Sequence, residues 1–327
     1  MPVACWLGAA GLMAVLVVRF TGFDYWYPMT QIMAFMPYYV VAGILVVAAF
    51  VLQKRWYAVA LSVLMTIAIS LLVIPRVVSD GGPTPAGVGI RVMSVNLRVG
   101  GADAGDIAAL AQRAGVDVIA FQEFTPEAAA RLDAAAGLDQ FSYRSVHPRE
   151  LALGSAIYSR LPMTDDGVRR HQSGFYQARG TLDVPGAGQV AVESAHPCAP
   201  TGSARSRCWA EDLADQPPGG NECLKRNSGQ AECMPATTTS AQILLGDFNA
   251  TLDHAPLRKL LNTGYTDAAA SVGMGLTPTW PYDKPIPKIA LDHVLVNARV
   301  SIGSFAVHAI GGTDHRCVIA DLTIRAT

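Results

Sequence analysis

The chain has 327 residues, a length that allows one large domain or two and by itself excludes little. Composition is more informative: 51% of the residues are hydrophobic and only 16% are charged, and the apolar excess is concentrated in the first 75 residues. Charge argues against binding to duplex nucleic acid. Four of the 25 basic and one of the 26 acidic residues lie within 1–76, which leaves 21 against 25 beyond them, a net charge of minus four.

Three apolar segments occupy the N-terminal part, at about 2–18, 29–52 and 56–74, and none contains an acidic or basic residue. Each is long enough to cross a bilayer, the first only just. A cleaved signal peptide is the alternative for the first segment, although it lacks a basic region before the apolar run. Residues 1–76 are therefore predicted to form a membrane anchor with three transmembrane helices.

The connections between these segments predict the orientation. Lys54 and Arg55 lie in the short second connection, and basic residues favour the cytoplasmic side of a membrane. The first connection is rich in aromatic residues, which are typical of a membrane interface. It is then predicted to face outward, together with everything that follows Arg76.

Cysteine usage gives a second indication of the compartment. Four cysteines fall within 36 residues of a polar stretch: Cys198, Cys208, Cys223 and Cys233. Disulfides suit an oxidising, extracytoplasmic environment, and a zinc site is the alternative, although the spacing lacks a close C-x2-4-C pair. Sequence does not fix the pairing, but the equal separations make the first with the second and the third with the fourth the simplest arrangement. Residues 198–239 are predicted to be a disulfide-pinned loop that either covers a site or decorates the surface.

A Gly- and Pro-rich stretch at 77–89 predicts a flexible linker before a second domain at 90–327. Strands are predicted at 90–96, 116–123, 141–146, 154–159, 189–195, 242–246 and 289–297, and helices at 103–114, 126–136 and 255–262. The segment DVPGAGQ predicts a hairpin, and a final pair of strands is predicted around GGTDHRC. This mixed order favours an α/β sandwich over a helix bundle.

Several predicted strands share a carboxylate, amide or imidazole at one end. These residues are Asn96, Glu123, His196, Asp247, Asn249, Asp292, Asp314 and His315. One such residue alone is a common strand cap, but strand ends that meet at one rim bring these groups together. Oxygen ligands of this kind suit Mg²⁺ or Mn²⁺, and crowded carboxylates without a cation would cost stability. A cation there commonly serves phosphate chemistry, in which a histidine or carboxylate handles the proton.

A set of motifs over residues 90–325 resembles the endonuclease/exonuclease/phosphatase superfamily. They are SVNLR, VIAFQE, GSAIYSR, AHP, GDFNA, TPTWP, LDHVLV and TDHR, in the family's order. The resemblance implies a four-layered α/β sandwich, with two packed mixed β-sheets between helices, that hydrolyses phosphoesters. It also implies that Glu123 is the main metal ligand, with Asn96 beside it and Asp314 supporting the metal side, the metal being Mg²⁺ or Mn²⁺.

The same resemblance implies the catalytic roles. His315 contacts the scissile phosphate and assists proton transfer, and Asp292 orients its imidazole. Asp247 and Asn249 position the attacking water and the phosphate. His196 contacts phosphate or protonates the leaving group, with a simple turn cap as its alternative role.

Other histidines are left out of the predicted site. His293 follows Asp292 directly on a strand and should therefore point to the opposite face. Four more match no motif and are predicted to lie on the surface: His147, His171, His254 and His308.

The anchor and the short linker predict the substrate. A domain held against the outer face of the bilayer meets lipid-linked phosphates at raised effective concentration. The layout also resembles bacterial members of the superfamily connected with teicoplanin resistance. We therefore expect a phosphohydrolase or phosphodiesterase in the bacterial cytoplasmic membrane, with its active site outside, acting on a lipid-linked phosphate. No protein partner is predicted. An extracytoplasmic nuclease and a catalytically silent binding domain are the alternatives.

Overall fold

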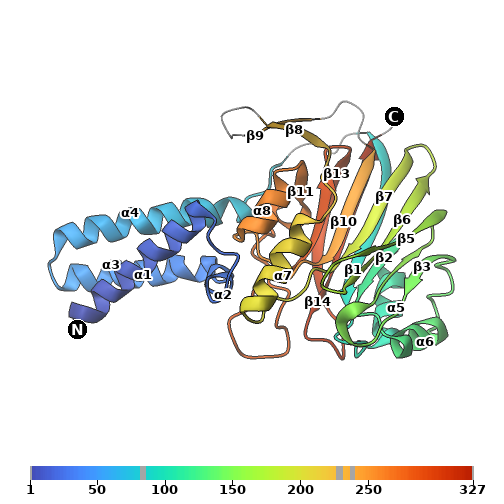
Figure 1. The fold of residues 1–327 in the computed structure, drawn as a ribbon, viewed down its shortest axis with the longest axis horizontal. Helices are drawn as coiled ribbons and strands as arrows, with labels where there is room; N and C mark the ends of the chain where they lie inside the picture. The colour runs from blue at the N-terminus through green and yellow to red at the C-terminus, as the bar shows by residue number, and fades with distance from the viewer. Residues whose placement is uncertain (1, 82–85, 226–230, 236–239, 326–327) are drawn as a thin grey trace.

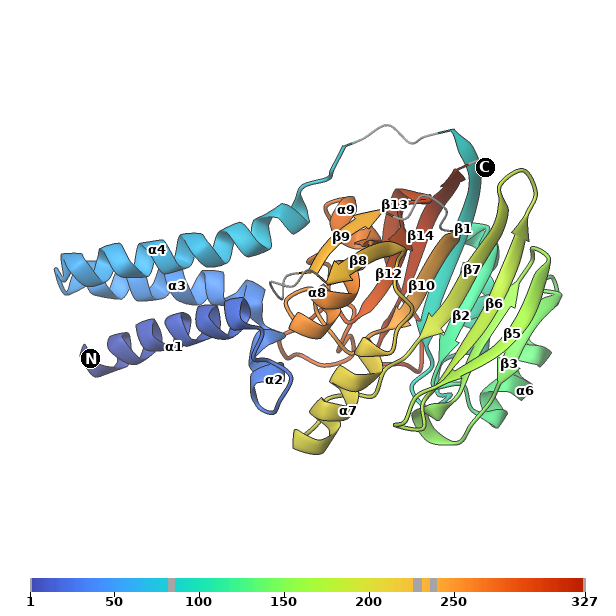
Figure 2. The same cartoon turned by 45° about the horizontal axis from the view of Figure 1, so that its top comes forward.

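The structure is a computed structural model that describes residues 2–81, 86–225, 231–235 and 240–325. The chain forms a helical bundle at one end and a β-sandwich with helices at the other (Figure 1). The N-terminal helices are α1 (Pro2–Thr21), α2 (Met29–Met33), α3 (Met36–Leu52) and α4 (Trp56–Val73). Helices α1, α3 and α4 pack side by side around a shared apolar core and extend away from the sandwich (Figures 1 and 2).

Within the described residues, two helical segments are long and apolar enough to cross a membrane, Val3–Thr21 and Trp56–Val77. The segment predicted as one helix at 29–52 is instead broken, because α2 ends at Met33 and α3 begins at Met36. Helix α3 has 17 residues and is apolar throughout. Membrane crossing stays a prediction, and the break gives the chain a short helix between the bundle and the sandwich.

The first sheet has six strands in the order β13-β14-β1-β2-β4-β3. Their bounds are β1 Gly87–Asn96, β2 Val118–Gln122, β3 Tyr143–His147, β4 Ser155–Ser159, β13 Val300–Ala309 and β14 Arg316–Arg325. Strands β1 and β2 are parallel, while β14 pairs antiparallel with β1. The parallel pair directs the carboxyl ends of β1 and β2 to one edge of the molecule.

The second sheet also has six strands, in the order β11-β12-β10-β7-β6-β5. Their bounds are β5 Met163–Arg170, β6 Tyr176–Val184, β7 Gly188–Ala195, β10 Ala241–Asp247, β11 Tyr265–Asp267 and β12 Asp292–Asn297. Strands β7 and β10 are parallel, and β12 runs antiparallel beside β10 with Asp292 opposite Asp247. The predicted α/β fold with two mixed sheets is thus confirmed.

Alternating side chains sort into separate apolar cores, which explains the layering. Ile243 and Leu245 of β10 face the core between the two sheets, whereas Leu244 faces the outer core under α7 (Ser203–Ala214) and α8 (Ala255–Leu261). The side chains of strand β1 alternate in the same way. The face of β1 that points away from the other sheet is covered by α5 (Ala104–Ala114) and α6 (Pro126–Ala134). The order is therefore helices, sheet, sheet, helices (Figure 2).

Helices α5 and α6 begin at side-chain caps. Asp103 accepts the backbone N–H of Asp106 at 2.8 Å, and Thr125 accepts that of Ala128 at 3.1 Å. Helix α5 ends at Gly115, whose φ of 64° is the left-handed conformation that glycine adopts without strain. These boundaries lie close to the predicted ones because each depends on local sequence.

The cysteine-bearing insert differs from the predicted loop. It contains the twelve-residue helix α7, followed by the short strands β8 (Asn221–Lys225) and β9 (Ala231–Pro235). The disulfide between Cys198 and Cys208 is confirmed. The predicted pair Cys223 and Cys233 lies where the backbone register sets the two residues opposite each other, and their side chains lie outside the described part of the structure.

Two of the four histidines predicted to lie on the surface are buried. His171 is 5% exposed and faces Asp212 and Asp215, and His254 is 2% exposed. His293 points away from Asp292, as expected, and its Nδ1 lies 2.8 Å from Asp267. The surface prediction was wrong for His171 and His254 because each is covered by chain that is distant in sequence.

The stretch predicted as a linker is anchored on its N-terminal side. Helix α4 runs into the 3-10 helix η1 (Ile74–Val77), and Ser79 forms an isolated β-bridge with Val272. Strand β1 begins at Gly87.

Candidate active site

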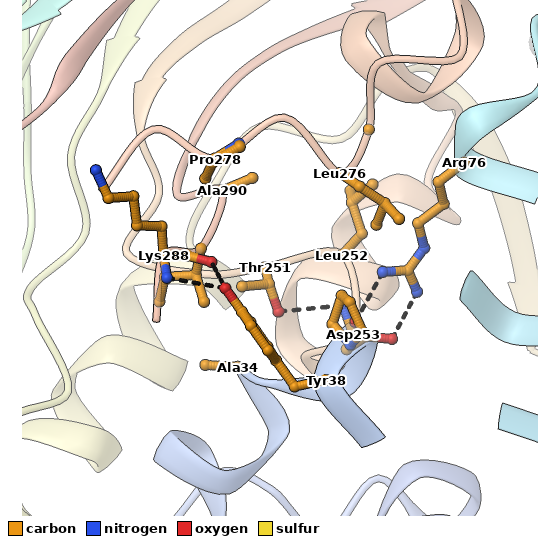
Figure 3. Close-up of a pocket in the computed structure, with 13 residues that line it drawn as sticks. Ala34, Tyr38, Arg76, Thr251, Leu252, Asp253, Leu276, Pro278, Lys288 and Ala290 are labelled. Carbon is orange, nitrogen blue, oxygen red and sulfur yellow. Dashed lines mark hydrogen bonds and ion pairs between the residues drawn. The ribbon is translucent and has the colours of Figure 1, made fainter. Parts of the chain in front are cut away.

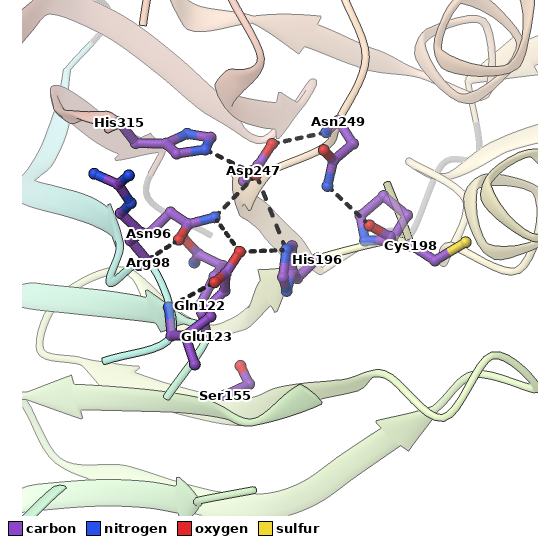
Figure 4. A network of polar contacts seen from close by, with 12 residues as sticks. Asn96, Arg98, Gln122, Glu123, Ser155, His196, Cys198, Asp247, Asn249 and His315 are labelled. Carbon is purple, nitrogen blue, oxygen red and sulfur yellow. Dashed lines mark hydrogen bonds and ion pairs between the residues drawn. The ribbon is translucent and has the colours of Figure 1, made fainter. Parts of the chain in front are cut away.

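Polar side chains from both sheets converge at one end of the sandwich (Figure 4). Asn96 and Glu123 come from the carboxyl ends of the parallel pair β1 and β2, and His196 and Asp247 from the ends of β7 and β10. The rim that the sequence analysis expected therefore belongs to two facing sheets rather than to one.

Asn96 links two carboxylates at the centre of this rim. Its Nδ2 donates to Glu123 Oε1 at 3.2 Å and to Asp247 Oδ2 at 3.0 Å. Its oxygen accepts the backbone N–H of Arg98, and the N–H of Val99 donates to Glu123 Oε2 at 2.6 Å. Glu123 has a φ of 55°, a conformation that costs a non-glycine residue about 1 kcal/mol or more and that concentrates at functional sites.

His315 and Asp292 form the predicted pair of imidazole and orienting carboxylate. Nδ1 of His315 lies 3.0 Å from Asp292 Oδ2, and Nε2 lies 3.6 Å from Asp247 Oδ2. Burial alone would lower the pKa of His315, but Asp292 and Asp247 outweigh burial and raise the pKa to about 10. The backbone N–H of Asp292 donates to Thr279 Oγ1 at 3.1 Å, which fixes the start of β12.

His196 lies on the other side of Asp247. Its Nε2 is 3.9 Å from both Glu123 Oε1 and Asp247 Oδ2. Within the described part of the chain its buried Nδ1 has no hydrogen-bond partner. Burial lowers the pKa of His196 to about 4, so the ring is neutral at pH 7. Gln177 accepts the backbone N–H of His196 at 2.8 Å, which places the ring at the end of β7.

The turn after β10 carries Asp247 and Asn249. Asp247 Oδ1 accepts the backbone N–H of Asn249 at 2.8 Å, and Asn249 Nδ2 donates to the carbonyl of Pro197 at 3.1 Å. Gly246 precedes them, and a Cβ there would lie 1.9 Å from the carbonyl oxygen of Ala195 on β7. Glycine is required because the two parallel strands approach closely where the site begins.

Asp314 lies at the outer edge of the group. Its Oδ2 accepts the indole N–H of Trp280 at 3.1 Å, and its Oδ1 is 3.7 Å from Arg98 Nε. Arg98 also pairs with Asp283 at 3.1 Å. The structure thus brings all eight predicted site residues to one end of the sandwich, with Asp314 engaged by an arginine and an indole.

Comparison with known proteins agrees with this arrangement. The model of the Endonuclease/Exonuclease/phosphatase family matches residues 93–315, well over half of the chain. The chain belongs to the endonuclease/exonuclease/phosphatase family. It is thus a phosphoesterase-type hydrolase by family, and members of the family are metal-dependent phosphoesterases. No curated protein sequence matches the chain significantly.

Solved structures show the same endonuclease/exonuclease/phosphatase fold. A family member from Beutenbergia cavernae is 20% identical with a TM-score of 0.56, and 72% of each chain is covered. Humanised TDP2 of D. rerio is 14% identical with a TM-score of 0.55, over 72% of this chain and 99% of that one. The mannosyl-6-phosphatase Bt3783 of Bacteroides thetaiotaomicron is 15% identical with a TM-score of 0.51, over 72% and 100%. At these identities the likeness concerns the fold.

The residues around Glu123 fit a hard divalent cation. Glu123 and Asp247 share Asn96 Nδ2 as donor and His196 Nε2 as neighbour, so two carboxylates are crowded together. Burial raises the pKa of Asp247, which shows the cost of ionising this carboxyl without a compensating charge. Carboxylate and amide oxygens are the ligands that Mg²⁺ or Mn²⁺ prefers, and Glu123 lines the open pocket.

A second group also lies within the spacing of metal ligands. Potential ligand atoms of Asp247, Asp292 and His315 lie within 4.8 Å of one another. However, Nδ1 of His315 is hydrogen-bonded to Asp292, so only Nε2 is open to another partner. Asp292 and Asp247 also raise the pKa of this ring, and an imidazolium has no lone pair to offer a metal. The arrangement is therefore compatible with the predicted division, with a cation on the side of Glu123 and Asn96 and proton chemistry at His315.

This division determines what the site can do chemically. A cation bound at Glu123 would supply Lewis-acid polarisation of a phosphoryl oxygen. The ring of His315 is placed to bind a phosphate oxygen or to deliver a proton from Nε2, because Asp292 holds the other nitrogen. In the predicted roles, Asp247 would accept a hydrogen bond from the attacking water, and the amide of Asn249 would orient the phosphate. His196, neutral at pH 7, adds a hydrogen-bonding group beside Glu123.

A cavity of about 690 Å³ leads to these side chains. It also contains residues to which the sequence analysis gave no role, among them Arg98, Trp280 and Arg205. The first two belong to the quoted motifs SVNLR and TPTWP, so motif membership was an available signal. Arg205 lies in the first turn of α7 and had no such signal, because the insert was predicted to be a loop. Residues of the N-terminal segment line the cavity as well.

Proposed function

We propose that this family member is a membrane-anchored, divalent-metal-dependent phosphohydrolase or phosphodiesterase that acts on a lipid-linked phosphate outside the bacterial cytoplasmic membrane. The metal is Mg²⁺ or Mn²⁺. The reaction is hydrolysis of a phosphoester or phosphoanhydride whose phosphate sits between Glu123 and His315 and whose apolar group is embedded in the bilayer.

One observation supports this proposal most: the active-site cavity opens between the sandwich and the end of the apolar bundle. Its polar end holds Glu123, Asp247 and His315, and its other walls include Phe35 and Ile286. A phosphate carrying a hydrocarbon chain has this same division into a charged and an apolar part. An extended nucleic-acid backbone instead calls for a basic groove, and the residues beyond 76 carry a net negative charge.

The orientation of the bundle is compatible with the predicted topology. The turn between α3 and α4, which contains Lys54 and Arg55, lies at the end of the bundle far from the sandwich (Figure 1). The cavity is lined by residues of the connection 22–35 and of the sandwich, which places it at the near end of the bundle. Basic residues at the far end favour the cytoplasm there and the outer face for the catalytic end. Protease treatment of intact spheroplasts tests this orientation, since the sandwich should be degraded from outside.

A substrate panel tests the function. The full chain in detergent or vesicles is incubated with farnesyl pyrophosphate, farnesyl phosphate, phospholipids and plasmid DNA, with Mg²⁺ and with chelator. We expect release of phosphate or head group from a lipid, only with the cation, and loss of it in Glu123→Gln and His315→Ala. Degradation of DNA alone would show a nuclease, and absence of turnover on every substrate would show a silent domain.

A further inference from the structure

The cavity wall facing the bilayer side is supplied by the membrane anchor itself. Five residues of the connection between α1 and α3 (22–35), here called the anchor wall, line the cavity: Tyr27, Thr30, Gln31, Ala34 and Phe35. They lie outside residues 93–315 that match the family model. The part of the chain that matches the family model therefore provides the catalytic groups, and a segment outside that match completes the enclosure around them.

A buried ion-pair cluster fixes the anchor to the sandwich (Figure 3). Asp253 accepts two hydrogen bonds from the guanidinium of Arg76, at 2.7 and 2.5 Å, and Arg19 Nε lies 3.5 Å from the same carboxylate. The Asp253 side chain is fully buried, and the arginines are 11% and 10% exposed. Tyr38 adds a hydrogen bond from its hydroxyl to the carbonyl of Lys288 at 2.8 Å.

The connection is held by the loop that follows the catalytic turn. His254 Nδ1 accepts the backbone N–H of Thr251 at 2.8 Å, so Nε2 carries the proton and donates to the carbonyl of Thr30 at 2.7 Å. Burial lowers the pKa of His254, in keeping with a neutral ring. Asp24 accepts the backbone N–H of Ala255 at 2.8 Å. Residues 247–255 thus carry both the catalytic Asp247 and the contacts that place the anchor wall.

The cavity surface changes from polar to apolar toward this wall. Ala34 packs against Ile289 and Leu291 in a small apolar core that Phe35 and Trp280 join. Ile286, 49% exposed, lies at the cavity in the facing loop. Gln31 donates from its side chain to the carbonyl of Pro200 and so connects the wall to the insert. The apolar surface lies beside the catalytic groups, on a segment that directly follows α1, a helix of bilayer-spanning length.

We propose that the anchor wall and Ile286 form a binding site for the hydrocarbon group next to the scissile phosphate, so that the anchor selects the substrate as well as tethering the enzyme. The occupant is the chain of a membrane-embedded phosphate, because the site joins a phosphate-binding centre to helices of bilayer-spanning length. This proposal rests on the proposed function for the identity of the substrate, and its test measures binding separately from hydrolysis.

The test compares the binding of octyl phosphate and methyl phosphate to the full chain in nanodiscs by titration calorimetry. Octyl phosphate should bind more tightly. The ratio of the two dissociation constants, methyl phosphate over octyl phosphate, should fall about tenfold or more in Phe35→Ala and in Ile286→Glu. This is the loss expected when roughly two methylene groups lose their burial. Partition into the bilayer is the same for every variant and cancels in the comparison. Phe23→Ala is the matched control, because Phe23 is half exposed in the same connection and does not line the cavity.

Photolabelling of the unchanged chain gives a second measurement in case Phe35→Ala fails to fold. An octyl phosphate with a diazirine at its chain end should label the anchor wall and the loop around Ile286, and methyl phosphate should compete. Labelling confined to the bilayer faces of α1, α3 and α4, insensitive to methyl phosphate, would overturn the proposal.

The two levels of the proposal fail in different ways. Chain-dependent binding at the anchor wall without hydrolysis of any lipid-linked phosphate contradicts the proposed function and leaves the binding site standing. Hydrolysis of a lipid-linked phosphate with the same octyl advantage in Phe35→Ala, Ile286→Glu and the unchanged chain contradicts the binding site alone.

Discussion

Removing the charge of Asp253 should loosen the contact between the N-terminal helical bundle and the sandwich. The carboxylate lies between Arg76 and Arg19 and is fully buried, so Asp253→Asn preserves the side-chain shape and leaves two nearly buried guanidinium groups without their counter-charge. Breaking a buried ion pair by removing one partner costs about 3–5 kcal/mol. We expect a loss of this size in the free energy of unfolding.

Urea unfolding of the full chain in detergent, followed by tryptophan fluorescence, measures this loss. The matched control is Asp321→Asn, because Asp321 pairs with Arg91 but both side chains are 39% exposed. An exposed pair contributes about 1 kcal/mol or less. Chymotrypsin, which cleaves after aromatic residues such as Phe23 and Tyr25, should also cut within 22–35 faster in Asp253→Asn, since the anchor wall loses its support. Equal, small losses in the two variants would refute the role of Asp253 in docking.

Three further predictions concern the site and the insert. Because Asp292 and Asp247 raise the pKa of His315 to about 10, from about 6.5 when unfolded, its stabilising contribution is complete below pH 6.5 and disappears as pH rises through 10. The unfolding free energy of the metal-free chain should therefore fall between pH 7 and pH 10, and less so in His315→Gln. Glu123→Gln should weaken Mg²⁺ binding at least about tenfold by titration calorimetry, since one anionic oxygen ligand is lost; unchanged affinity would place the cation elsewhere. Cys198→Ser should lower the unfolding free energy by about 2–3 kcal/mol under oxidising conditions, because the disulfide with Cys208 closes a short loop. In reducing agent, the difference in unfolding free energy between the variant and the unchanged chain should vanish.

Elements with a local signal were predictable from sequence. The strand at 242–246 corresponds to β10 within a residue at each end, because an apolar run bounded by polar turns specifies a buried strand. Strand β5 was missed because it lies at the sheet edge and its sequence MTDDGVRR has no apolar alternation. Helix α7 was missed because its sequence is polar and sits in a stretch rich in Gly, Pro and Ser.

The candidate site likewise has residues that the sequence could predict and residues that it could not. Motif order placed Glu123 and His315 at strand ends, and the fold brings those ends to one place. The roles of His254 and Phe35 could not be predicted, because each depends on contact between segments more than 200 residues apart in sequence. Such contacts follow from the docking of the bundle, and no periodicity or spacing in the chain encodes them.

The most direct measurement is hydrolysis by the full chain reconstituted in vesicles, with farnesyl phosphate or farnesyl pyrophosphate in the bilayer and plasmid DNA in solution, in the presence of Mg²⁺. We predict phosphate release from the lipid, its loss on addition of chelator or in His315→Ala, and intact DNA. Degraded DNA together with untouched lipid would contradict a lipid-linked substrate.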